Sequence, residues 1–104
     1  MAPMADKNII QKSNLRVPPQ SVDSEKAVLG SIMLRPGAIH EINDIVNVDS
    51  FYASKHGRIY EIMLELSSKG EPIDILSVSH KLSDRGQLEQ VGGSTYLSEL
   101  TNAV

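Results

Sequence analysis

Residues 86–100 read GQLEQVGGSTYLSEL and place two adjacent glycines between two apolar patterns. A nucleotide-binding P-loop requires Gly-x-x-x-x-Gly-Lys-Ser/Thr, in which the lysine reaches the terminal phosphates. This stretch has a different spacing and no lysine, and it follows a helical pattern instead of a strand. Gly92 suits a helix C-cap, Gly93 frees the turn, and Ser94 suits the N-cap of the next helix. We interpret the stretch as a joint between two helices.

Helical periodicity continues on both sides of this joint. Apolar residues recur three or four positions apart, which is the spacing that lines one face of an α-helix. No stretch alternates apolar and polar residues as a half-buried strand does. The sequence therefore predicts an all-α fold of five or six short helices. The expected helical segments are residues 21–34, 35–46, 54–70, 71–86 and 94–104, with a short turn of helix around Leu88 and Val91.

The first segment contains a glycine in its middle. Ser21 suits the N-cap position, and Asp23 and Glu25 would then lie in the positive first turn. Gly30 costs up to about 1 kcal/mol relative to alanine inside a helix. We therefore expect a neighbouring helix to pack closely against it. The apolar stripe of this helix comprises Val28, Leu29, Ile32 and Met33.

Local signals predict where the other helices begin and end. We expect Asp49 to cap a short turn that directs Phe51 and Tyr52 into the core. Gly70 suits a left-handed cap, Asp74 can cap the following helix, and Gly86 closes it. The predicted stripes are Ala38, Ile39, Ile42, Ile45 and Val46; then Ile59, Ile62, Met63 and Leu66; then Ile75, Val78 and Leu82; and finally Tyr96, Leu97, Leu100 and Val104.

The 104-residue chain suits one domain preceded by a tail. Residues 1–20 lack periodicity and end in RVPPQ, so we expect a flexible tail; its three basic and one acidic side chains give a net charge of +2. Residues 21–104, the expected folded head, carry seven basic and twelve acidic side chains, a net charge of −5. An acidic body repels a phosphate backbone. A protein partner, including a basic one, is favoured over nucleic acid.

The composition also indicates a compartment. The chain has no cysteine, which excludes disulfides and thiolate metal sites. Its N-terminus lacks the features of a signal peptide, and no apolar run approaches the roughly 18 residues of a membrane span. We therefore expect a cytoplasmic protein without membrane contact.

Side chains that serve in enzyme sites are present but not grouped. His40, His56 and His80 fall on three different predicted helices, without the three- or four-residue spacing of paired metal ligands. We expect surface or half-buried histidines. Glu61 and Glu65 share a helix face that we interpret as solvated, and no serine lies in a Gly-x-Ser-x-Gly elbow. The sequence predicts no catalytic, cofactor-binding or metal-binding residue in this chain.

Several short signatures occur in a specific order. Pro19-Gln20 precedes the first helix, and Ala27-Val28-Leu29-Gly30 lies within it. Later signature residues are Phe51, Tyr52, His56, Ile59, Gly70, Pro72, Ile73, Asp74, Gly92, Gly93, Tyr96 and Leu97. Over about residues 17–104, this series resembles the N-terminal domain of the bacterial replicative DNA helicase, the DnaB family. The resemblance implies core positions for Phe51, Tyr52, Ile59, Tyr96 and Leu97, and a helix start at Pro72 and Asp74.

The resemblance implies a compact, orthogonal helical head, the non-catalytic part of a homohexameric, ATP-driven helicase. Heads of this family form a collar at the ring's entrance, pair through a helical hairpin that follows the head, and help to recruit primase and helicase loader proteins. ATP and Mg²⁺ would bind a separate C-terminal domain of the parent protein, and DNA would be contacted only through the full ring. We expect this chain to end before the hairpin. Its partner-binding residues are not predicted.

Two other functions stay open from the sequence. The first is an unrelated helical adaptor, which a P-loop ATPase encoded downstream would rule out. The second is a helix-turn-helix DNA reader formed by residues 74–85 and 94–104. Its second helix carries Glu99 and only one suitable base- or phosphate-binding residue, Asn102, which argues against DNA reading.

Overall fold

A computed structural model describes residues 19–104, with side chains described from Val22 onward. Within that range the chain forms five α-helices and no β-strand, which confirms the predicted all-α fold. Two single turns of 3-10 helix, η1 and η2, lie between them. The elements are α1 (Pro19–Leu34), α2 (Ala38–Asn43), η1 (Val48–Ser50), α3 (Ser54–Ser68), α4 (Ile75–Asp84), η2 (Glu89–Val91) and α5 (Gly93–Thr101).

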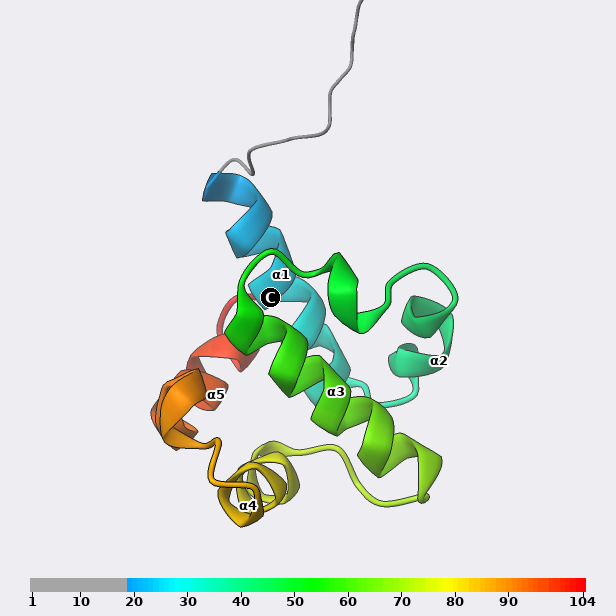
Figure 1. The fold of residues 1–104 in the computed structure, drawn as a ribbon. Coiled ribbons are helices and arrows are strands. Elements are labelled where there is room, and N and C mark those ends of the chain that lie inside the picture. Colours follow the sequence, from blue (N-terminus) through cyan, green and yellow to red (C-terminus); the bar gives the residue numbers. More distant parts are fainter. Residues whose placement is uncertain (1–18) are drawn as a thin grey trace, which may run out of the picture.

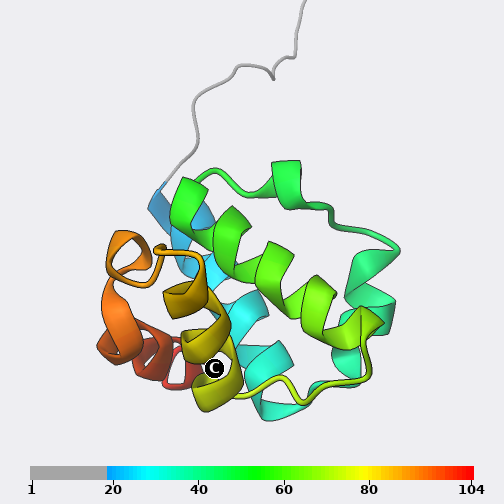
Figure 2. The ribbon, with the colours of Figure 1, turned by 60° about the horizontal axis from the view of Figure 1, so that its bottom comes forward.

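Helix α3 is central, and the other elements surround it. In Figure 1 it lies in front of α1, with α2 and η1 to its right and α4 and α5 below and to its left. Figure 2 brings α4 forward, where it lies between α3 and α5 and contacts both. The enclosed core consists of Leu29, Ile32, Met33, Ile39, Ile59, Tyr60, Ile62, Met63, Leu66, Ile73, Val78, Leu82, Val91, Leu97 and Leu100.

The ends of α3 and α4 follow the sequence signals. After α3, Gly70 has φ +69°, its N–H donates to Ser67, and the N–H of Glu71 donates to the Leu66 carbonyl at 2.9 Å. This bonding pattern satisfies carbonyls that the helix would otherwise leave free, and it needs a left-handed residue. The side chain of Asp74 accepts from the Ser77 N–H at 2.7 Å and caps α4, as predicted. Gly86 ends α4 in the same way as Gly70 ends α3.

The double glycine is a joint, as predicted. Gly92 and Gly93 have φ values of +104° and +74°, which side-chain-bearing residues rarely adopt. The predicted cap is wrong, however. Helix α5 begins at Gly93 with Gly92 as its N-cap, so Ser94 lies inside the helix, where its Oγ is 3.1 Å from Oγ of Ser79 on α4.

The close packing expected at Gly30 is confirmed. A Cβ added there would lie 2.0 Å from the carbonyl oxygen of Leu100 and 2.8 Å from Cγ2 of Val104. Helices α1 and α5 therefore approach to a distance that only glycine allows. On the same helix, Leu29 and Ile32 are fully buried and Met33 nearly so, in agreement with the predicted stripe.

Helix α2 is shorter than predicted. It ends at Asn43, and Ile45, expected in the core, is 83% exposed. Asn and Asp residues compete with helical hydrogen bonds and favour turns, and here Asp44 is the C-cap. The chain then turns so that the carbonyl of Val46 accepts the hydroxyl of Tyr60 at 2.9 Å. This bond ties the segment that follows α2 to α3.

Three further predictions about local positions are wrong. Asn47, not Asp49, caps η1, through reciprocal side-chain bonds with Ser50. Tyr52 is 64% exposed instead of buried, and its backbone N–H donates to the carboxylate of Glu25. Val104 lies beyond the end of α5 and is 64% exposed.

The N-terminal boundary also differs from the expected one. Helix α1 begins at Pro19, so Ser21 lies within it and is not its N-cap. Proline suits the first position of a helix, where its missing N–H is not needed. Residues 1–18 of the predicted tail lie outside the described residues.

The substitution Gly30→Ala is expected to lower the free energy of unfolding by about 1–3 kcal/mol. The new methyl group would overlap the Leu100 carbonyl, a backbone atom that moves only with its helix. Urea unfolding followed by circular dichroism measures the change. Gly37→Ala is the matched control, because no atom lies within 4 Å of the added Cβ. Equal midpoints for the two variants would contradict the close contact.

The substitution Leu97→Ala is expected to destabilise the domain by about 2–4 kcal/mol, because it leaves a cavity in the core. Leu97 is fully buried, whereas Leu76, the matched control, is 78% exposed. Leu76→Ala should leave the thermal midpoint nearly unchanged. A Leu97→Ala midpoint equal to that of the wild type would show that the stripe is not packed.

Candidate functional site

The most unusual internal feature is a buried histidine. His56 on α3 has no exposed surface. Its Nδ1 lies 2.7 Å from Oε1 of Glu25 on α1, and its Nε2 lies 2.6 Å from the hydroxyl of Tyr96 on α5. We call these three residues the polar bridge. It connects α1, α3 and α5 at one point.

The hydrogen-bonding roles in the polar bridge follow from the carboxylate. An ionised Glu25 can only accept, so Nδ1–H of His56 donates to it. In a neutral ring, Nε2 is then an acceptor and the Tyr96 hydroxyl donates to it. Each polar atom of the imidazole is thereby satisfied without solvent, which is the condition for burying it at low cost.

Glu25 also stabilises the start of α3. The N-cap position of α3 is Ala53, whose side chain cannot cap a helix. Glu25 instead accepts the N–H of Tyr52 at 2.6 Å through Oε2 and the N–H of Ala53 at 3.3 Å through Oε1. A carboxylate at this position satisfies free N–H groups and interacts favourably with the positive end of the helix dipole. The prediction that Asp23 and Glu25 lie in the first turn of the helix is wrong, because α1 begins at Pro19 and its first turn holds no acidic residue. The sequence does not predict the contact of Glu25 with α3.

The polar bridge is not arranged for nucleophilic catalysis. Burial, followed by the charges of Glu99 and Glu25, raises the pKa of the Tyr96 hydroxyl, whereas an activated nucleophile needs a lowered pKa. The imidazole has no exposed surface for a substrate to reach. Lys55 covers the Tyr96 ring, with Nζ 3.8 Å from the ring centroid. The arrangement keeps the phenol protonated and donating, which is a structural role.

The three histidines therefore have different environments. His56 is fully buried, so the expectation of a surface or half-buried position is wrong for it. His40 and His80 are exposed, and His80 Nδ1 lies 3.6 Å from Asp84. One sequence signal could have revealed His56: it shares a helix face with Ile59, Tyr60 and Met63, all buried. No cluster of His, Asp and Glu in residues 19–104 could hold a metal ion.

The signature residues occupy several environments. Ile59 and Leu97 are fully buried, and Ile73 is nearly so. The half-buried ring of Phe51 lies 5.1 Å from that of Tyr60, measured between centroids. Pro72 is exposed just before the cap residue Asp74, and Gly92 and Gly93 form the joint. The structure gathers His56 and Tyr96 into the polar bridge and leaves Tyr52 at the surface.

Glu61 and Glu65 differ despite sharing a helix face. Glu65 forms an ion pair with Arg85 after α4 and lies 3.6 Å from Nζ of Lys69. Partial desolvation alone would raise the pKa of Glu65, but the Arg85 hydrogen bond and the nearby cations outweigh it and lower the pKa. Glu61 remains exposed, as expected for a solvated face.

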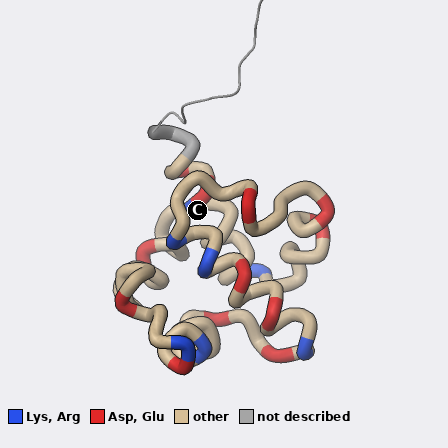
Figure 3. Tube along the Cα trace, viewed as in Figure 1, with Lys and Arg blue, Asp and Glu red and all other residues tan. Residues whose placement is uncertain are grey.

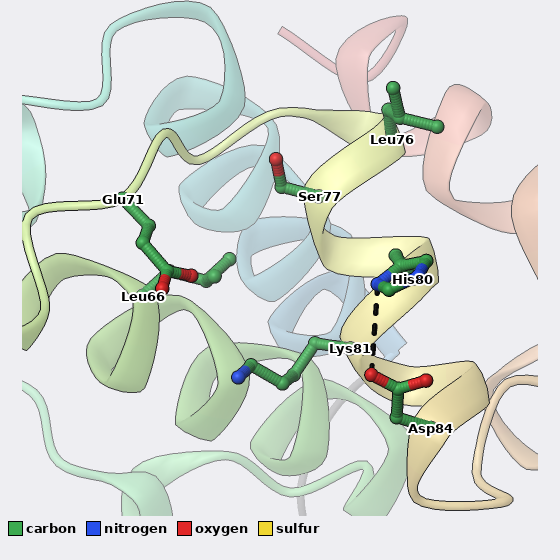
Figure 4. A pocket seen from close by; sticks show the side chains of 7 residues that line it. All are labelled: Leu66, Glu71, Leu76, Ser77, His80, Lys81 and Asp84. Atoms are coloured by element: carbon green, nitrogen blue, oxygen red, sulfur yellow. Dashed lines mark ion pairs between the residues drawn. The ribbon is translucent and has the colours of Figure 1, made fainter.

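The surface of the described residues offers several shallow openings. A pocket of about 510 Å³ lies between α3 and α4 (Figure 4). Lys81 points across it toward Glu71, and Leu76 points outward from the start of α4. Two of its titratable side chains, His80 and Asp84, lie 3.6 Å apart, measured from Nδ1 to the carboxylate. The lining residues are Leu66, Glu71, Leu76, Ser77, His80, Lys81 and Asp84.

The charge distribution argues against a DNA-reading surface. On the face shown in Figure 3, acidic residues follow α3 and the nearby loops, and basic residues are scattered among them. Helix α5, the would-be recognition helix, contains Glu99 and no lysine or arginine. Phosphate and base contacts depend on those side chains. The fold and its internal polar groups thus define a helical head whose chemistry is used to hold it together.

The chain belongs to the DnaB-like helicase N terminal domain family, whose profile matches residues 17–104. It is 43% identical over 89 residues to the replicative DNA helicase DnaB of Geobacillus stearothermophilus, covering 86% of this chain and 20% of that protein. It is 42% identical over 91 residues to the replicative DNA helicase DnaC of Bacillus subtilis, covering 88% and 20%. The chain therefore spans about a fifth of the length of these relatives.

A solved structure agrees with this assignment. The N-terminal domain of DnaB helicase from Mycobacterium tuberculosis superimposes with a TM-score of 0.80 at 35% identity, covering 85% of this chain and 61% of that one. The resemblance drawn from the signature residues is thereby confirmed. None of the helices within residues 19–104 has the length and apolar character needed to span a bilayer.

The substitution Tyr96→Phe is expected to lower the free energy of unfolding by about 1–3 kcal/mol, because Nε2 of the buried His56 loses its partner. Tyr52→Phe is the matched control, since its ring is largely exposed. It should leave stability nearly unchanged. Equal losses in the two variants would contradict the role assigned to the Tyr96 hydroxyl.

A comparison of the wild type with Tyr96→Phe also tests the raised pKa of Tyr96. The unfolded phenol ionises at the ordinary tyrosine pKa of about 10, whereas the folded phenol stays protonated to a higher pH. The stability that the folded state gains from the protonated phenol is fully present below the ordinary pKa. It is lost as pH rises through the higher pKa of the folded state. The stability gap between wild type and Tyr96→Phe should therefore narrow at alkaline pH. Tyr60, whose pKa burial also raises, is common to both proteins and cancels.

Proposed function

We propose that this chain is the non-catalytic head of a hexameric, ATP-driven replicative DNA helicase and acts through protein contacts. The observation that carries the proposal is the family match over residues 17–104, because the relatives that share this region are named replicative DNA helicases. The chain covers only 20% of those relatives, which supports assigning nucleotide-dependent activity to another part of the parent protein.

The head would act as one unit of a collar. Six heads around a ring entrance present six copies of one surface, and linked copies raise the effective local concentration of a partner's second binding site. A single head would then bind weakly and a full collar tightly. Within this proposal the partners are other heads, primase and a helicase loader, and DNA is contacted only through the assembled ring in the cytoplasm. ATP and Mg²⁺ bind the parent's ATPase domain.

The internal structure supports such a scaffold role. The polar bridge connects three helices and leaves no reactive group free among its own members. The close contact at Gly30 holds α1 against α5. A head fixed in this way presents its surface with little reorganisation on binding, which lowers the cost of association. The net charge of −5 over residues 21–104 favours protein partners over a nucleic-acid backbone.

The purified 104-residue chain is expected neither to hydrolyse ATP nor to unwind a forked DNA substrate, because its sequence holds no phosphate-binding loop. A coupled ATPase assay and a fluorescent unwinding assay measure the two activities. The intact parent protein is the positive control. Turnover by the chain that survives further purification would overturn the proposal that it is non-catalytic.

Assembly and partner binding are tested by comparing this chain with a longer version that continues through the expected hairpin. Sedimentation velocity should show weak association for the chain and defined oligomers for the longer version. In pull-downs, the longer version should capture more primase and loader than the 104-residue chain does. A longer version that stays monomeric and captures neither partner would exclude the collar role.

A further inference from the structure

A groove lies between η1 and the first half of α3, away from the pocket of Figure 4. We call it the Tyr52 groove; its volume is about 280 Å³. Helix α3 approaches η1 closely at Gly57, where an added Cβ would lie 3.1 Å from the carbonyl oxygen of Val48. The lining residues are Val48, Asp49, Phe51, Tyr52, Ser54, Gly57, Arg58 and Glu61.

The aromatic ring at this groove is exposed but its backbone is fixed. Tyr52 is 64% exposed, and its N–H donates to the Glu25 carboxylate at 2.6 Å. The preceding residue, Phe51, packs inward against Tyr60. Tyrosine is enriched among residues that dominate protein interfaces, since it contributes large contact area at low entropic cost. A tyrosine displayed from an anchored backbone is therefore suited to binding.

The charges around the groove lack internal partners. The side chains of Asp49, Arg58 and Glu61 make no hydrogen bond or ion pair with any other described residue. By contrast, Glu65, one turn further along α3, is engaged by Lys69 and Arg85. Two carboxylates against one guanidinium leave a net negative groove. Its free charges favour a cationic occupant.

The size and chemistry together identify the occupant. The groove is smaller than the roughly 300–1,000 Å³ of typical small-molecule sites, but it can take one long side chain. A guanidinium stacks on an aromatic face and binds carboxylates through two parallel hydrogen bonds. Its aliphatic stem would lie against Val48 and Phe51, which are half-buried. Arginine meets all three requirements at once.

We propose that the Tyr52 groove docks an arginine-bearing segment of a partner protein, with the guanidinium over Tyr52 and paired with Asp49 or Glu61. The inference rests on the proposed function in that the head works by protein contacts, and it specifies the chemistry of one such contact. The groove belongs to a single head and does not depend on assembly of the ring.

The test is a titration of the ¹⁵N-labelled chain with the peptide acetyl-Leu-Arg-Leu-amide, followed by amide chemical shifts. The expected result is saturable shifts concentrated in residues 48–61. The same peptide with citrulline, which keeps the shape and lacks the charge, should give much smaller shifts. Shifts of equal size with citrulline, or shifts centred on residues 66–84 or scattered over all acidic residues, would overturn the proposal.

Variants identify the residues involved. Tyr52→Ala, Asp49→Asn and Glu61→Gln should each weaken the peptide's Kd about two- to fivefold, the range of an exposed cation–π or ion-pair contact. Glu89→Gln, an exposed glutamate on η2, is the matched control and should leave the Kd unchanged. Equal Kd values across all four variants would also overturn the proposal.

The outcome is separable from that of the proposed function. Tyr52→Ala in the longer version should still form oligomers, because the groove is not needed for assembly. If the peptide fails to bind while the longer version assembles and captures primase, the groove proposal alone is lost. If the longer version neither assembles nor captures a partner, the collar role is lost whatever the peptide does.

Discussion

The carboxylate of Glu25 is the contact on which the arrangement of the helices depends. One of its oxygens accepts from His56 and both accept backbone N–H groups at the start of α3. A single side chain of α1 thus supplies the cap that α3 lacks and the partner that its buried histidine requires. Replacing Glu25 would remove the acceptor at the start of α3 and the partner of His56 Nδ1. A buried donor left without a partner costs more free energy than the net gain from the hydrogen bond.

Two further contacts hold α5 against the rest of the head. Tyr96 brings α5 to the imidazole, and Gly30 lets the carbonyl of Leu100 approach the backbone of α1. Both contacts fix α5 relative to α1, one through side chains and the other through backbone atoms. The polar groups of the polar bridge are engaged in internal hydrogen bonds, so contacts with partners would be made by the surface of the head.

The sequence predicts the parts of this fold that depend on neighbours along the chain. The stripes of α1, α3 and α4 follow from helical spacing, and Gly70 and Gly86 follow from the need for left-handed residues at helix ends. Features that depend on distant partners were missed. His56 bonds to residues 31 and 40 positions away. Beyond the end of α2, the carbonyl of Val46 accepts the hydroxyl of Tyr60, a bond that the pattern of neighbouring residues does not predict.

The same reasoning explains the candidate binding surface. Phe51 and Tyr52 are adjacent aromatic residues, and composition alone makes both suitable for a core. The amide of Tyr52 is held by Glu25, so one ring turns inward and the other outward. The groove it lines is formed by η1 and α3, which approach closely at Gly57, where an added Cβ would lie 3.1 Å from the carbonyl oxygen of Val48. Such a surface is formed by tertiary contacts, and the periodicity of apolar residues in the sequence does not predict it.

The short helix α2 has a consequence for the motions of the head. Its six residues contribute one buried side chain, Ile39, and it lies outside the polar bridge. Segments with few buried contacts open at low free energy, while strongly connected elements open only together. Backbone amides of α2 should therefore exchange hydrogen with solvent well before those of α1, α3 and α5. Helix α2 would open by local unfolding, whereas α1, α3 and α5 would unfold together as one cooperative unit.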